Sequence, residues 1–155
     1  MPVVDLLALP DLPPRRTPLF GLDIGEKTIG VAVSDLSRTI ASPLTLLHRR
    51  KFTDDAAALF ALMAERGATG LVIGLPVNMD GSEGARCQSN RAFARNLNRL
   101  RADLPIAFWD ERMSTMAVNR MLIGEADLTR ARRAEVVDKA AAAWILQGAL
   151  DRLRS

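Results

Sequence analysis

The stretch Phe20-Gly21-Leu22-Asp23-Ile24-Gly25 alternates apolar residues with glycine or aspartate. A period of two is typical of a β-strand with one apolar face, so we expect a strand at about 19–24. A second apolar stretch at 29–35 follows a short turn that begins with glycine, which predicts a β-hairpin. A carboxylate inside such a strand is costly to bury without hydrogen bonds or a cation. We therefore interpret Asp23 as a metal ligand.

The composition is that of an ordinary soluble domain. The chain has 155 residues, is 48% hydrophobic and contains one cysteine, Cys87, so an internal disulfide is excluded and a reducing cytoplasm is expected. The segment before Pro18 is rich in proline, and we expect a flexible tail over residues 1–17 and one domain over 18–155. No apolar run is long enough for a membrane helix, and no signal peptide is recognised.

The remaining periodicities predict three more strands and four helices. The strands are expected at Thr39–Leu47, Gly70–Leu75 and Pro105–Trp109. The helices are expected from an N-cap at Thr53 to Arg66, from a cap at Ser82 to about Ala102, from Ser114 to Leu122, and after Thr129–Arg133. The order βββαβαβαα predicts an α/β fold in which an antiparallel meander is followed by parallel crossovers.

Two further acidic residues are candidates to join Asp23. Glu111 lies at the end of the last predicted strand, and Asp138 precedes an alanine run whose small side chains favour close packing of a helix on the sheet. Carboxylates that converge repel one another, so the arrangement indicates a divalent cation, and oxygen ligands without a histidine or cysteine cluster favour Mg²⁺ or Mn²⁺. Each residue also has a simpler interpretation. Asp23 could be a hydrogen-bonded structural aspartate, Glu111 a member of a surface ion-pair cluster, and Asp138 an acid that favours the start of a helix.

The net charge of +3 permits a nucleic-acid partner without showing one. Arg91, Arg95 and Arg99 recur at helical spacing. Such a stripe is either a solvated helix face or a set of contacts to phosphates.

Four blocks in order carry a family resemblance: GLDIGEKTIGVAVSD, VIGLPVNMDGSEG, WDERMSTMAVNRML and VVDKAAAAWILQGALD. Over about residues 19–153 the chain resembles the YqgF/RuvX family, whose members are described as Holliday junction resolvases or pre-16S rRNA nucleases. The resemblance implies a ribonuclease H-like fold, with a mixed five-stranded sheet and helices on both faces. It also implies that Asp23, Glu111 and Asp138 are the metal-binding catalytic carboxylates.

The same resemblance assigns residues around the carboxylates. Lys27 matches a lysine after the first strand, and Thr28 stands where many members have arginine. Asn78 and Gly81–Ser82 match a loop bordering the substrate cleft. Arg112, with Arg91 and Arg95 on the helical stripe, is a candidate to neutralise or hold the phosphate backbone.

The resulting hypothesis is a two-metal-ion nuclease that processes the 5′ end of pre-16S rRNA. The alternatives are a Holliday junction resolvase, which must act as a dimer to make two symmetric cuts, and a non-catalytic nucleic-acid-binding module. An ATP-binding member of the wider group is disfavoured, because one domain of this length lacks a second lobe. The nuclease itself is expected to be a monomer or homodimer without a membrane partner.

Overall fold

The computed structural model describes residues 3–11, 16–113 and 130–154, and it does not describe the side chains of 10, 11, 113 and 130–138. These residues form one five-stranded sheet with the strand order β3-β2-β1-β4-β5. The strands are β1 (Leu19–Ile24), β2 (Thr28–Ser34), β3 (Ala41–His48), β4 (Gly70–Leu75) and β5 (Ile106–Asp110). The first three strands are antiparallel, and β4 and β5 run parallel to β1. The predicted mixed sheet is confirmed.

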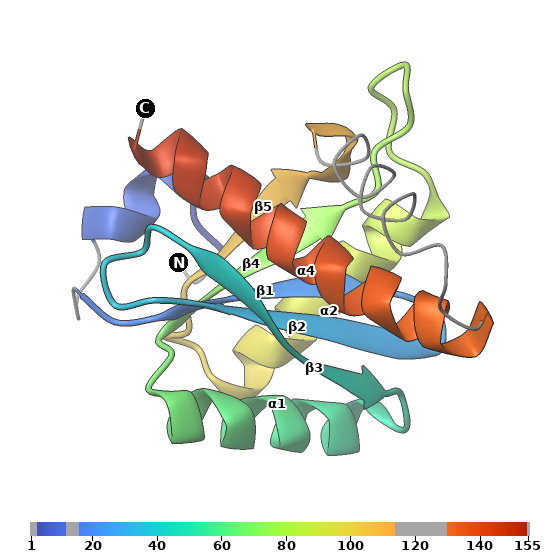
Figure 1. The fold of residues 1–155 in the computed structure, drawn as a ribbon, viewed down its shortest axis with the longest axis horizontal. Coiled ribbons are helices and arrows are strands. Elements are labelled where there is room, and N and C mark those ends of the chain that lie inside the picture. The colour runs from blue at the N-terminus through green and yellow to red at the C-terminus, as the bar shows by residue number, and fades with distance from the viewer. Residues whose placement is uncertain (1–2, 12–15, 114–129, 155) are drawn as a thin grey trace.

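Helices cover both faces of the sheet (Figure 1). On one face lie α1 (Phe52–Arg66) and α2 (Ala85–Leu100), and on the other lies α4 (Arg130–Arg154). A short 3₁₀ helix, η2 (Glu111–Met113), follows β5. The predicted helix Ser114–Leu122 falls outside the described residues. Among those described, no helix is long and apolar enough to cross a membrane.

The alternation in β1 divides its side chains between two cores. Phe20, Leu22 and Ile24 are buried in the core under α1 and α2, as the period of two predicts. Leu19 belongs to the core under α4. Asp23 has the same parity as Leu19, so its side chain lies on the α4 face of the sheet. The strand pattern therefore decides which helix faces the candidate carboxylate.

Close approach of α4 to the sheet depends on Gly21. A Cβ atom on Gly21 would lie 2.6 Å from the Cβ of Leu146 and 3.0 Å from the carbonyl oxygen of Ala142. Ala142 is fully buried. The expected role of the alanine run in close packing is thus confirmed at Ala142.

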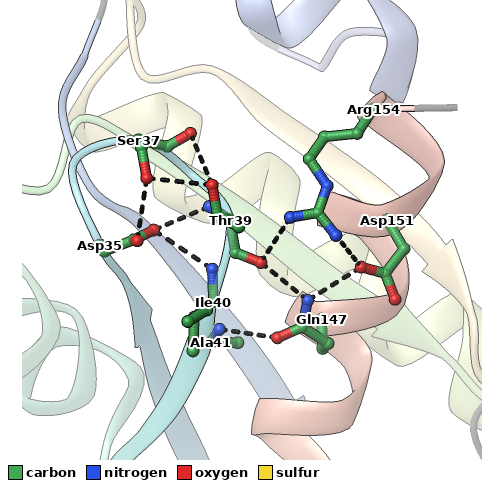
Figure 2. Close-up of polar contacts among 8 residues, drawn as sticks. All are labelled: Asp35, Ser37, Thr39, Ile40, Ala41, Gln147, Asp151 and Arg154. Carbon is green, nitrogen blue, oxygen red and sulfur yellow. Dashed lines mark hydrogen bonds and ion pairs between the residues drawn. The ribbon is translucent and has the colours of Figure 1, made fainter.

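Figure 2 shows how the C-terminal half of α4 is bonded to the β2–β3 turn. Gln147 accepts a hydrogen bond from the Ala41 backbone N–H at 2.9 Å and donates one to the Thr39 carbonyl, also at 2.9 Å. The turn itself is closed by Asp35, which accepts hydrogen bonds from the backbone N–H groups of Thr39 at 2.7 Å and Ile40 at 3.2 Å. These bonds set the position of α4 across the sheet.

Two predicted helix starts are wrong. The first helix begins at Phe52, and the Asp55 carboxylate accepts a hydrogen bond from the Arg50 backbone N–H at 2.9 Å instead of Thr53 acting as the cap. Ser82 does not cap α2, because its N–H and hydroxyl both bond to Asp80, and the helix begins at Ala85. Local hydrogen bonds within each loop displace both starts.

The N-terminal segment packs against the sheet over residues 3–11, where the sequence predicts an extended or disordered tail. Val3 forms a bridge with Ile106, and the Val4 N–H donates to the Ile106 carbonyl at 2.8 Å. A 3₁₀ helix, η1 (Leu6–Asp11), follows, and Leu9 within it is only 2% exposed. Burial of apolar side chains offsets the cost of ordering this proline-containing segment. The proposed boundary between tail and domain near residue 17 stays a prediction.

Candidate active site

Asp23 and Glu111 come together at the carboxyl ends of the parallel strands. Asp23 is the penultimate residue of β1, and Glu111 follows the last residue of β5. The strand between them is β4, where Gly74 pairs with Trp109 and the preceding Ile73 pairs with Leu22. The sheet order therefore places one carboxylate on each side of β4.

Gly74 leaves the space that lets the two carboxylates meet. A Cβ atom at this position would lie 2.9 Å from Cγ and 3.0 Å from Cδ of Glu111. The Glu111 side chain consequently lies over the backbone of Gly74 and reaches the Asp23 carboxyl, with which it can share a hydrogen bond when one of the two groups is protonated. Only glycine permits such a close approach of a side chain to a central strand.

The surroundings of Glu111 disfavour its negative charge. Burial and then the neighbouring Asp23 carboxylate raise the pKa of Glu111 from 4.5 to about 7, while the positive charge of Arg86 opposes the rise. Two carboxyl groups in contact cannot both ionise without cost unless a cation lies between them. Hard divalent cations prefer such oxygen ligands. The pair thus fits a metal site, although two carboxylates alone provide few ligands.

The third predicted ligand, Asp138, has a described backbone position but not a described side chain. It lies in α4, four residues before Ala142, whose carbonyl oxygen borders Gly21 on β1. Gly21 and Asp23 share one face of that strand. The backbone of Asp138 is therefore about one helical turn from Ala142, which packs against β1, the strand that carries Asp23. Among residues with described side chains, no group of three or more acidic, histidine or cysteine residues could hold a metal.

Two predicted phosphate-binding residues, Arg112 and Arg91, are engaged with acidic partners. Arg112 makes a bidentate ion pair with Asp110, at 2.5 Å for the shortest contact, and donates hydrogen bonds to the carbonyl groups of Asn78 and Met79. Asn78 in turn donates its side-chain amide to Ser82 at 3.1 Å. Arg112 thus connects Asp110 at the end of β5 to the backbone of the β4–α2 loop.

On the helical stripe, Arg91 is also ion-paired. It makes two hydrogen bonds to the Glu83 carboxylate, at 2.7 and 2.8 Å, and its guanidinium lies 4.9 Å from the ring centre of Phe108. Arg95 and Arg99 are exposed. Lys27 is exposed in the turn between β1 and β2, close along the chain to Asp23.

A model of the family described as "RuvX: Holliday junction resolvase" matches residues 17–152. The chain belongs to the RuvX family. A protein of Phenylobacterium zucineum, named "Putative pre-16S rRNA nuclease", is 77% identical over 155 residues, covering 100% of this chain and 99% of the relative. A Caulobacter vibrioides protein of the same name is 64% identical over 154 residues, with 99% of each chain covered.

Solved structures resemble this RuvX chain in fold. RuvC of T. thermophilus, in complex with a Holliday junction substrate, superposes with a TM-score of 0.55 and 13% identity over 88% of this chain and 96% of that one. Fowlpox virus resolvase, solved with Holliday junction DNA, also gives 0.55, with 8% identity over 90% and 100% of the two chains. The ribonuclease H-like fold predicted from the sequence is confirmed.

Sequence analysis of this RuvX chain missed two cationic residues at the carboxyl end of β1, the strand that carries Asp23. Arg86, in the first turn of α2, donates a hydrogen bond to the Ile24 carbonyl at 3.3 Å, and its charge acts on Glu111. Arg49, just beyond β3, donates to the Gly25 carbonyl at 2.7 Å. Neither falls in a motif or in the arginine stripe, so only the tertiary fold identifies them.

Proposed function

We propose that this chain is a metal-dependent endonuclease that hydrolyses phosphodiester bonds near the 5′ end of pre-16S rRNA. The contact between the Asp23 and Glu111 carboxyl groups across Gly74 carries the proposal. A protein that only bound phosphate would gain nothing from clustered negative charge, because like charges repel the substrate backbone. The names of the high-identity relatives support rRNA as the substrate.

Asp23, Glu111 and Asp138 would hold Mg²⁺ or Mn²⁺, and we extend the proposal to two ions held by these carboxylates. Such ions would supply a reactive water at neutral pH and neutralise charge on the leaving oxygen. The residues of the chain set the geometry. Gly74 fixes the path of the Glu111 side chain, the ladder between β1 and β2 fixes Asp23, and burial of Glu111 strengthens its interaction with a bound cation.

The second candidate substrate is a four-way DNA junction. The family description and the DNA in two structural neighbours favour it. A resolvase cuts two strands symmetrically, so this substrate requires a homodimer, whereas a monomer suffices for rRNA.

A cleavage assay with both substrates tests the proposal. Purified protein is incubated in Mg²⁺ or Mn²⁺ with a 5′-extended 16S rRNA fragment or with a four-way junction. The proposal predicts metal-dependent cleavage of the RNA that Asp23→Asn abolishes. Asp103→Asn, an exposed aspartate before β5, is the matched control and retains activity. Paired junction cuts without RNA cleavage would move the assignment to a resolvase, and cleavage of neither substrate would contradict both.

A further inference from the structure

Two arginines from distant segments meet at the end of β1. Arg86 of α2 donates to the carbonyl of Ile24 at 3.3 Å, and Arg49 donates to the adjacent carbonyl of Gly25 at 2.7 Å. These carbonyls directly follow Asp23 in the chain. Both guanidinium groups are therefore anchored at the carboxyl end of β1, and the charge of Arg86 also acts on Glu111.

The charges of these two arginines are available to a ligand. In the part of the chain that the structure describes, the ion pairs involve Arg91, Arg112 and Arg154, and none includes Arg49 or Arg86. A guanidinium has five N–H donors, and each hydrogen bond to a backbone carbonyl uses one of them. A hydrogen bond to a carbonyl orients the group without cancelling its charge.

The position of Arg49 is fixed further by packing. Its guanidinium carbon lies 5.8 Å from the ring centre of buried Phe93, which makes an edge-to-face contact with Phe52. The Arg49 backbone N–H also donates to the Lys27 carbonyl at 2.8 Å, which holds exposed Lys27 in the same neighbourhood. An oriented cation loses less conformational entropy when it binds a ligand.

We propose that Lys27, Arg49 and Arg86 form a binding site for the phosphodiester backbone of a single nucleic-acid strand at the carboxyl end of β1, the strand that carries Asp23. Arginine forks match the geometry of phosphate oxygens, and three cations offset the repulsion between the substrate and the carboxylates. Arg91 and Arg112, which are also predicted to contact phosphates, differ in that their guanidinium groups are bound to Glu83 and Asp110.

This site rests on the proposed function for its choice of ligand, but its test measures binding rather than cleavage. The dissociation constant for the 5′-extended 16S rRNA fragment is measured in EDTA at several salt concentrations, with wild type, Arg49→Gln, Arg86→Gln and Arg66→Gln. Arg66 is exposed at the end of α1, so its variant has the same change in charge away from the site. Arg49→Lys and Arg86→Lys keep the charge, and circular dichroism confirms that each variant is folded.

The logarithm of the association constant falls as the logarithm of the salt concentration rises. The site predicts that each glutamine substitution at Arg49 or Arg86 makes this slope less steep by about 0.7. The lysine variants and Arg66→Gln keep the wild-type slope. Unchanged slopes in the glutamine variants, or no binding by wild type at low salt, would overturn the site. A different outcome separates the two proposals. If the glutamine variants lose salt-dependent binding but the wild-type protein cleaves no substrate, the nuclease proposal is rejected and the binding site is retained.

Discussion

The Glu111 side chain crosses β4 directly over Gly74, with only 2.9 Å between its Cγ and the position of a Cβ on that glycine. The contact between the two carboxyl groups depends on this missing side chain. Glycine inside a buried strand weakens packing and β propensity, so the presence of Gly74 near the end of β4 has a specific structural consequence.

Gly74→Ala is expected to separate the carboxylates. Its methyl group would also lie 2.5 Å from Cδ1 of Ile145, so the variant loses about 1–3 kcal/mol of unfolding free energy through overpacking. Cleavage by the folded variant falls more than stability predicts, because Glu111 is displaced. Gly84→Ala is the control, since its Cβ would meet Asn78 at an ordinary 3.6 Å. Denaturant unfolding and cleavage rates test this, and wild-type cleavage by Gly74→Ala would contradict it.

Glu111→Gln is expected to abolish cleavage while stabilising the metal-free protein at neutral pH. Folding raises the pKa of Glu111 from 4.5 to about 7, so wild-type stability falls as the pH rises through this range. The variant lacks this loss, which amounts to about 3 kcal/mol at most. Thermal melts in EDTA between these pH values measure the difference. Parallel pH profiles for the two proteins would show that the Glu111 carboxyl is not destabilised.

The positions of the two carboxylates were predictable, because Asp23 occupies the polar phase of a clear period of two and Glu111 follows an apolar strand. Their contact was not, because it depends on strand order and on Gly74, which the sequence shows only as part of a strand end. Asp138 stays a prediction at the level of its side chain.

The cations were harder to predict than the carboxylates. Arg91 pairs with Glu83 across the start of α2, a spacing of eight residues that no helical pattern reveals. Arg86 was not singled out because the sequence predicts a helix start at Ser82 and gives Arg86 no special position. Its partner on β1, the Ile24 carbonyl, is 62 residues away in the chain. Charge alone did not separate the ion-paired arginines from those bound to carbonyl groups at the end of β1.

Arg112→Lys is expected to loosen the β4–α2 loop, because lysine cannot reproduce the bidentate pair with Asp110 together with the bonds to the Asn78 and Met79 carbonyl groups. Hydrogen exchange measured by mass spectrometry should accelerate in the loop after β4. Exchange in α1 serves as the internal control. An unchanged loop with weaker RNA binding would show that Arg112 contacts the substrate instead.

Gln147→Ala is expected to destabilise the fold through α4. It leaves the partly buried Ala41 N–H without its acceptor and removes a donor from the Thr39 carbonyl (Figure 2), at a cost of about 1–3 kcal/mol. Gln88→Ala, exposed on α2, should change the unfolding free energy by less than about 0.5 kcal/mol. Urea unfolding compares the two, and equal effects would contradict a specific role for the Gln147 bonds.

The central claim is that Asp23 and Glu111 bind a divalent cation, and calorimetric titration with Mn²⁺ tests it most directly. Wild type and Asp103→Asn should bind the ion, whereas Asp23→Asn and Glu111→Gln should each bind it at least about tenfold more weakly. Equal Mn²⁺ affinity in all four proteins would contradict the claim and remove the metal centre from this pair of carboxylates.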